Sequence, residues 1–224
     1  MAMSRAERDA LDRAVSPARM STYVRAANGD VDWARGLYLW DRELAVAFLA
    51  DIALLEVALR NAMNDRLAAR WGPEWYARTD LPLDDRTCAQ PAQAHAGRAV
   101  ARADGRRWGR SYAHQVVARV NALRNRVAHH EPLIHGFPLP GQRLADGGAR
   151  RLTAEEGFDD LVRLAAMLDR ELARLLRRTS AVPDVLARRP RARDVRPRPA
   201  RGATRTPAGP VRRSWRLSRV AGST

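Results

Sequence analysis

The stretch LAVAFLADIALLEVALRNAMNDRL, residues 44–67, decides the fold of this chain. Large apolar side chains recur in it at steps of three and four residues, which places them on one face of an α-helix. They are Leu44, Phe48, Ile52, Leu55, Leu59, Met63 and Leu67. Gly72-Pro73 ends the pattern shortly after Arg70. We therefore expect a long helix with one buried stripe that reaches to Arg70.

Helical patterns also precede this stretch. Asp30 can cap a segment that continues into the long helix, either directly or with a break near Asp41. The aromatic and apolar residues of this segment include Trp33, Leu37 and Trp40. Further upstream, Ser16-Pro17 is typical of an N-cap followed by proline in the first turn, and the helix it opens fades at Asn28-Gly29.

Two more helices are predicted downstream, separated by a loop rich in glycine and proline over residues 132–148. The first spans residues 111–130, and its apolar face consists of Val116, Val117, Val120, Leu123 and Val127. The second opens at a capping box made by Thr153 and Glu156. Its apolar positions are Phe158, Leu161, Leu164, Leu168, Leu172 and Leu175. Strand signals are nearly absent, so the expected fold class is all-α.

Charge is unevenly distributed along the chain. All 40 basic residues are arginine, against 25 acids, and the net charge is +15. Residues 187–224 hold twelve of the arginines and one acid, so their net charge is +11, whereas residues 1–186 carry only +4. The expected organisation is an N-terminal helical extension (1–29), a helical domain (30–186) and a disordered basic tail (187–224). The tail is either a salt-dependent polyanion binder or a solvated extension without function.

The nearly balanced charge of residues 1–186 argues against a DNA-binding regulator, and no convincing helix-turn-helix is present. A single cysteine, Cys88, excludes an intrachain disulfide framework and fits a reducing compartment. Residues 4–15 are charged and lack the apolar core of a secretory signal. No run of 18 apolar residues exists, so no membrane span is expected. These features favour a cytoplasmic protein.

The segment LRNRVAHHEPL, residues 123–133, carries the candidate chemistry. Arginine is always charged and its planar fork fits phosphate oxygens, whereas histidine moves protons near neutral pH. Arg124 and His129 could therefore cleave RNA, with Asn125 placed i,i+4 to hold His129. Arg124 and His129 lie about 140° apart around a helix, so a second copy of the chain would complete the site better. The bare spacing proves little, because roughly two or three such matches are expected by chance.

The flanking sequence is more specific. RNRVAHHEPL (124–133) resembles the signature of the Abi-like (abortive-infection) family in the HEPN superfamily. LEVALRNA (55–62) resembles the first conserved helix of that family, and VPDVLARRP (182–190) is similar to its closing segment. Aromatic dipeptides flank the first-helix match at Leu39-Trp40, Trp71-Gly72 and Trp75-Tyr76. Residues 80–112 are shorter than the matching stretch in the family, whose aromatic Gly-Phe-Trp-like segment has no better counterpart here than residues 107–109.

The resemblance implies an all-helical HEPN bundle that forms a homodimer with the Arg…His motifs of both subunits facing each other. It implies a metal-independent endoribonuclease of phage defence or of a toxin system, with RNA as substrate, an antitoxin as partner in the toxin case, and no cofactor. Arg124 would stabilise the phosphate and His129 would act as acid or base during attack by the ribose 2′-OH. Its accessory positions are Asn125, His130, Glu56, Arg60 and Asn61. The alternative is a degenerate, non-catalytic HEPN-type module that binds RNA or protein.

Each candidate residue also has a purely structural interpretation. Arg124 could pair with an acid such as Glu131, while Asn125 and His129 bond loop carbonyls. Glu56 and Arg60 could form an intrahelical ion pair, or could hold Asn61 or Arg124 at the site. A metal site at His129, His130, Glu131 and His135 is disfavoured, because no i,i+4 histidine pair exists. Two aromatic groups are expected in the core rather than stacking on bases: Trp71, Trp75 and Tyr76 as a lid on the bundle, and Trp33, Tyr38 and Trp40.

Overall fold

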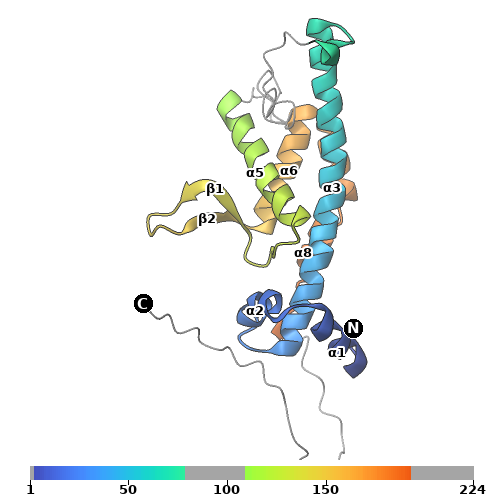
Figure 1. The fold of residues 1–224 in the computed structure, drawn as a ribbon. Coiled ribbons are helices and arrows are strands. Elements are labelled where there is room, and N and C mark those ends of the chain that lie inside the picture. The colour runs from blue at the N-terminus through green and yellow to red at the C-terminus, as the bar shows by residue number, and fades with distance from the viewer. Residues whose placement is uncertain (1–2, 79–108, 193–224) are drawn as a thin grey trace, which may run out of the picture.

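A computed structural model describes residues 3–78 and 109–192, which are mostly helical. Of the tail predicted to be disordered (187–224), residues 193–224 lie outside the described residues, as do residues 80–108 of the shortened segment. Residues 187–190 are part of the described fold, since Arg189 donates to the Ile134 carbonyl and the Pro190 carbonyl accepts from Trp33. Helix α3 (Val31–Trp71) forms the axis of the molecule. Helices α5 (Arg110–Ala128) and α6 (Ala154–Leu168) pack along its middle, and α2 (Pro17–Ala26) packs near its start (Figure 1). The short η1 (Trp75–Ala77) follows its far end.

Helix α3 is continuous over 41 residues, so the break considered near Asp41 does not occur. The Asp30 side chain accepts a hydrogen bond from the Trp33 amide, as its N-cap role requires. Gly72 follows the last helical residue with a φ of 90°, in agreement with the predicted end. Asp41 does not disrupt the helix because its carboxylate bonds other elements, α2 and the segment after α5. At 1.5 Å per residue the helix is about 60 Å long.

The N-terminal helices pack on the start of α3. Helix α1 (Arg5–Ala14) begins at a capping box formed by Ser4 and Glu7, and α2 begins after Ser16, as predicted. Arg35 of α3 bonds Asp12 of α1 through two nitrogens, at 2.9 and 2.5 Å. Helix α2 contributes Met20 and Tyr23 to the same core that the later helices fill.

The predicted apolar face of α5 is confirmed, since all five of its residues are buried. The Thr153–Glu156 capping box is also present at the start of α6. The single helix predicted through Leu175 is wrong, however, because Asp169 is extended and starts a separate helix, α7 (Arg170–Thr179). This break rotates the buried face, so Ala173 and Leu176 are buried instead of Leu172 and Leu175. The short α8 (Val182–Ala187) then returns to α3.

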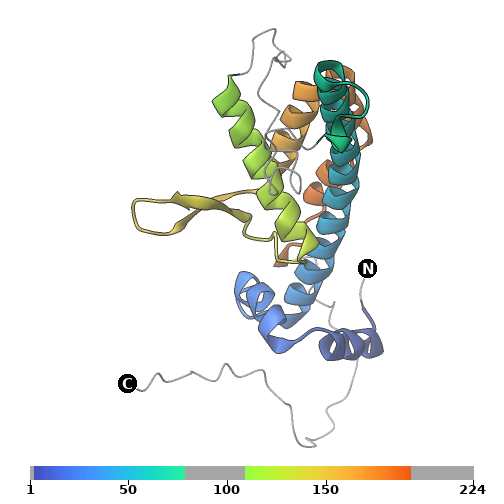
Figure 2. The ribbon, with the colours of Figure 1, turned by 45° about the horizontal axis from the view of Figure 1, so that its top comes forward.

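A β-hairpin occupies the segment that was predicted as a loop. Strands β1 (Phe137–Arg143) and β2 (Ala149–Leu152) pair antiparallel, with Phe137 opposite Leu152. Proline and glycine hide the strand pattern, and only the base of the hairpin reaches the core, while its tip projects from the helices (Figures 1 and 2). The all-α class therefore describes the helical body and misses this element.

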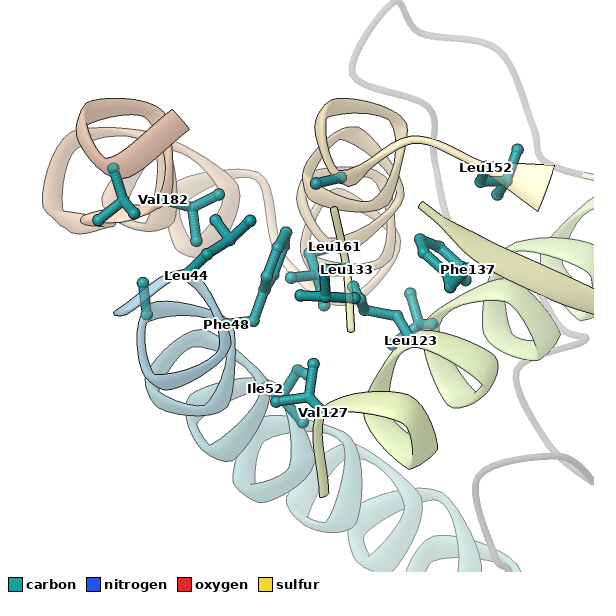
Figure 3. Packing of buried hydrophobic residues seen from close by; sticks show 14 of the residues in the cluster. Leu44, Phe48, Ile52, Leu123, Val127, Leu133, Phe137, Leu152, Leu161 and Val182 are labelled. Carbon is teal, nitrogen blue, oxygen red and sulfur yellow. The ribbon is translucent and has the colours of Figure 1, made fainter. Parts of the chain in front are cut away.

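The core lies where α3, α5 and α6 meet the base of the hairpin. Phe48, Leu123, Leu161 and Phe137 are fully buried there and point toward one another (Figure 3). Gly157 of α6 allows the close approach, because a Cβ at that position would lie 2.9 Å from the Phe137 ring. Burial of these side chains supplies the main free energy of folding.

The two aromatic groups behave differently from each other. Trp40 is buried and donates a hydrogen bond to the Val185 carbonyl, and Trp33 and Tyr38 pack at the core edge, so the core assignment is confirmed for this group. The core assignment of the predicted aromatic lid is wrong for Tyr76, which is 71% exposed, while Trp71 and Trp75 are only half-buried. The reason is that α3 extends beyond the bundle, so its last turns have no described helix to cover.

Candidate functional site

Helix α5 ends at Ala128, two residues earlier than predicted, and the histidines form its C-terminal cap. His129 is the C-cap, and His130 follows in the left-handed conformation with a φ of 54°. The His130 amide bonds the Val127 carbonyl and the Glu131 amide bonds the Arg126 carbonyl, which is the Schellman pattern. The left-handed conformation of His130 therefore ends the helix, two residues before Pro132.

Residues 130–136 form a loop that arginine side chains hold through its backbone carbonyls, and we call it the arginine-clamped loop. The donors come from four different parts of the chain. The pairs are Arg19 to His130 (2.7 Å), Arg126 to Pro132 (2.8 Å), Arg189 to Ile134 (3.4 Å), and Arg151 to His135 (2.8 Å) and Gly136 (2.7 Å). Carbonyls that no helix or sheet can satisfy are thus paired. The clamp fixes the chain that leaves His129.

A buried acid of α3, Asp41, also bonds the arginine-clamped loop. Asp41 of α3, which is 4% exposed, accepts hydrogen bonds from the Tyr23 hydroxyl at 2.7 Å and from the Leu133 amide at 3.0 Å. Burial raises the pKa of Asp41, although these hydrogen bonds and nearby arginines oppose the shift. Burial and the Asp41 charge also raise the pKa of the Tyr23 hydroxyl. Neither Asp41 nor Tyr23 was a candidate from the sequence, although Asp41 is an acid on the apolar face of a helix, which is a signal of a buried polar contact.

Side chains of the two motifs, RNRVAHHEPL and LEVALRNA, meet at an exposed site between α3 and α5, which we call the seam and which consists of Arg124, Asn125, Glu56 and Arg60. Within the described residues, no side-chain hydrogen bond or ion pair joins His129 or His130 to the seam. The Arg124 Nε atom lies 3.2 Å from Glu56 Oε1, although the two residues are 68 positions apart. Arg60 Nη2 lies 3.9 Å from the other Glu56 oxygen. Glu56 therefore contacts both arginines, which agrees with both interpretations of the Glu56–Arg60 spacing. Asn61 lies beside them on α3, exposed to solvent.

Two expected contacts differ in the structure. The Asn125 side chain accepts a hydrogen bond from Arg124 at 3.4 Å, and among the described residues no side-chain bond joins it to His129. The backbone carbonyl of Asn125 instead accepts from the His129 amide, because His129 continues the last helical turn. The structural alternative, in which Arg124 pairs with an acid, is present, but that acid is Glu56 and not Glu131, which pairs with Arg126 at 2.7 Å.

The seam is open to solvent and is rich in hydrogen-bond donors. Arg124 is 48% and Arg60 74% exposed at the side chain, and His129 and His130 are also exposed. Arg124 uses Nε and Nη1 on neighbours, so its guanidinium is oriented while part of it faces solvent. A guanidinium held in this way can contact a phosphate, and an exposed imidazole can exchange a proton with a bound substrate.

Neither a cluster of metal-binding side chains nor a membrane-spanning helix is found in the described part of the chain. Within residues 3–78 and 109–192, no three histidine, cysteine, aspartate or glutamate side chains converge to hold a metal ion. Across the same residues, no helix combines the length and the apolar character of a membrane span.

No protein-family model, curated protein or solved structure matches the chain.

Proposed function

We propose that this chain is a metal-independent endoribonuclease of the HEPN type, related to the Abi-like family. The observation that carries the proposal is the Arg124–Glu56 contact, because it joins the two motifs that resemble this family into one exposed site. The helical body and the position of the motif at the end of α5 agree with the resemblance. The clamped loop directly after His129 would hold that histidine in place.

The reaction would be transesterification of the RNA backbone. The ribose 2′-oxygen loses its proton and forms a bond to phosphorus, while the bond from phosphorus to the 5′-oxygen breaks and that oxygen gains a proton. The products are a 2′,3′-cyclic phosphate and a 5′-hydroxyl. Arg124 would stabilise the charge that develops on the phosphate oxygens, and His129 would transfer a proton. Glu56 would act as a positioning residue for Arg124.

A second copy of the chain would supply the remaining acid or base. Helix α3 carries four exposed large apolar residues, Val46, Leu49, Leu54 and Val57. Such residues on the solvent side of a helix mark an interaction surface when they cluster. They lie within about three turns of Glu56, so antiparallel pairing of two α3 helices through them would bring the two seams near each other. We therefore infer a homodimer with a composite site.

Cleavage of labelled RNA in the presence of EDTA tests the activity. The wild-type chain should produce cyclic phosphate ends, and Arg124→Ala and His129→Ala should each lose cleavage by about a hundredfold or more. Matched controls are Arg174→Ala, which removes another exposed arginine paired with a glutamate, and His114→Ala, which removes an exposed histidine of α5. Cleavage that EDTA abolishes, or that survives His129→Ala, rejects the mechanism.

Mixing inactive subunits tests the composite site. If each site takes Arg124 from one subunit and His129 from the other, a mixture of the Arg124→Ala and His129→Ala chains regains part of the activity. Val46→Glu combined with Val57→Glu should convert the dimer to a monomer in light scattering and reduce cleavage. A wild-type chain that is monomeric at assay concentration and still cleaves RNA contradicts the dimer.

A non-catalytic module is the second candidate, and one observation favours it. Glu56 already neutralises part of the Arg124 charge, and among the described residues no side chain orients the His129 ring. RNA binding without cleavage would identify this alternative. Inducible expression separates the two in cells: a toxin-type nuclease arrests growth with the wild-type chain and not with His129→Ala, whereas a binding module arrests growth with neither.

A further inference from the structure

The far end of α3 presents an exposed aromatic group. The Trp75 and Tyr76 rings meet edge to face, with centroids 6.1 Å apart, and the Tyr76 side chain is largely in solvent. The Arg70 guanidinium lies 5.0 Å over the ring of Trp71. Exposed aromatic rings beside arginines are the usual means by which proteins stack unpaired bases. This arrangement differs from the core lid that the sequence predicted.

Trp75 is tied back to the helix that carries the candidate site. Its indole Nε1 donates a hydrogen bond to the Asn64 side chain at 3.1 Å. Glu56, Arg60 and Asn64 are spaced i, i+4 and i+8, so they form one row on α3. Asn64 lies eight residues beyond Glu56, which is about 12 Å along the axis. One row of side chains therefore leads from the Arg124–Glu56 pair to the aromatic rings.

The charge of this end of α3 suits a polyanion. Residues 60–70 contain three arginines (Arg60, Arg66 and Arg70) and one acid, Asp65. Arg60 and Arg66 are exposed, and Arg60 stands between the candidate site and Trp75. A hydrophobic protein segment would gain little binding free energy from such a charged surface. A nucleic-acid strand can bind the arginines through its phosphates and the aromatic rings through its bases. A fully paired duplex would not offer bases to Tyr76.

We propose that Arg60, Trp75 and Tyr76 bind an unpaired stretch of RNA next to the scissile phosphate, with Arg60 on a phosphate and Tyr76 stacked on a base. This inference rests on the proposed function and narrows its substrate to RNA that is single-stranded beside the cleavage site. Asn64 acts as a positioning residue, since it holds the Trp75 ring against which Tyr76 packs.

Binding is measured on the full chain carrying His129→Ala, so that no cleavage occurs. The probes are a fluorescein-labelled single-stranded oligoribonucleotide and the same sequence in a fully paired duplex, followed by fluorescence anisotropy. Tyr76→Ala should weaken single-strand binding about tenfold or more and leave duplex binding unchanged. Tyr76→Phe keeps the ring and should restore the affinity. Leu175→Ala, another exposed apolar residue, is the matched control and should change nothing.

The phosphate contact has a separate readout. Arg60→Ala should reduce the slope of log affinity against log salt concentration by about 0.7, the value expected for one single-strand phosphate. Arg174→Ala, which removes a similarly exposed arginine that pairs with Glu171 on α7, should leave the slope unchanged. An unchanged slope for Arg60→Ala overturns the assignment of Arg60 to a phosphate.

The two proposals fail in different ways. Single-strand affinity that Tyr76→Ala leaves unchanged overturns the stacking site, even when the wild-type chain cleaves RNA through His129. Affinity that depends on Tyr76 in a chain that never cleaves RNA supports the binding site and rejects the nuclease. A Tyr76→Ala chain that changes its oligomeric state and keeps its RNA affinity places the aromatic pair in a subunit contact, and the stacking site is then wrong.

Discussion

Two regions that share the end of α5 use the same residue type in opposite ways. In the arginine-clamped loop, Arg126 is 16% exposed and donates to the Pro132 carbonyl. At the seam, Arg124 is 48% exposed and its partner is the Glu56 carboxylate. The two arginines are two positions apart on one helix. Each also pairs with a glutamate, Arg126 with Glu131 and Arg124 with Glu56. The loop carbonyl and the lower exposure of Arg126 therefore separate a structural arginine from a candidate catalytic one.

The difference has a physical reason. Both side chains use Nε and Nη1 on neighbouring residues, so the number of remaining donors does not distinguish them, whereas their exposure does. The carbonyls of an irregular loop need donors, and Arg126 supplies one of them from a largely buried position. An arginine held by one carboxylate at an exposed seam keeps an oriented face toward solvent. The clamped loop should therefore respond to substitution through stability, and the seam through activity.

Gly136→Ala should produce the largest effect, because it breaks the loop itself. Gly136 has a φ of 68°, and a Cβ there would lie 2.0 Å from the Leu152 carbonyl oxygen. The substitution should cost about 3 kcal/mol of unfolding free energy or more. Urea denaturation followed by circular dichroism measures this loss. A cost below about 1 kcal/mol would falsify the close approach of the loop to β2.

Asp41→Ala should be the next largest. The Tyr23 hydroxyl and the Leu133 amide would lose their acceptor inside the protein, while the cost of burying the carboxylate disappears. The net loss should be about 2–3 kcal/mol in urea denaturation. Tyr23→Phe removes one of these donors and provides the matched comparison, with a smaller loss. Equal stability of Asp41→Ala and the wild type would show that Asp41 does not anchor the loop.

Arg126→Ala and Arg124→Ala form the most direct test of the comparison. Arg126→Ala removes a half-buried donor of the loop and should lower stability by about 1–2 kcal/mol. Arg124→Ala removes an exposed ion pair and should change stability by less than about 0.5 kcal/mol, while abolishing RNA cleavage. Thermal denaturation and cleavage assays on both variants measure the contrast. The comparison fails if the stability losses are equal.

His130→Gly should have a small effect of opposite sign. His130 adopts a left-handed conformation that costs other residues about 1 kcal/mol relative to glycine, so the variant should be slightly more stable. His130→Val, a β-branched residue at the same φ, should be less stable than the wild type. Chemical denaturation of the three chains gives the order. A destabilised glycine variant would mean that the imidazole itself makes a contact of greater value.

Asp51→Asn should give the smallest effect and concerns an acid that belongs to neither region. Asp51 accepts a hydrogen bond from Ser180 at 2.6 Å, and burial raises its pKa. A folded pKa above the unfolded value means that stability falls as pH rises from about 4 through the raised pKa. Asp51→Asn should remove this part of the pH dependence and change stability at pH 7 by less than about 1 kcal/mol. Denaturation at several pH values checks the slope, and an unchanged slope contradicts it.

Several helices could be predicted from the sequence where apolar residues recur at helical spacing. The apolar face of α5 and the Thr153–Glu156 capping box needed no tertiary information, since both depend on neighbours within four residues. The break at Asp169 and the hairpin after Phe137 were missed. Both depend on what the local chain packs against, and the leucine spacing before and after Asp169 continues without a visible interruption.

The candidate site likewise has a part that the sequence predicted and a part that it did not. Arg124, His129 and the Glu56–Arg60 spacing could be selected from the sequence, because residue chemistry and motif are local. The partner of Arg124 could not, since Glu131 is close in sequence and Glu56 is 68 residues away. Helix α5 runs antiparallel to α3, and this arrangement places Glu56 beside Arg124 (Figure 1).

The stripe of residues 44–67 by itself determined a long helix with one buried face, because helix periodicity is a property of the chain alone. The tertiary structure decided what the other side of that helix does. It left Val46 and Val57 exposed, set Glu56 against Arg124, and left Tyr76 in solvent. These outcomes depend on where α5, α6 and α8 end against α3, and that is fixed by packing between distant segments.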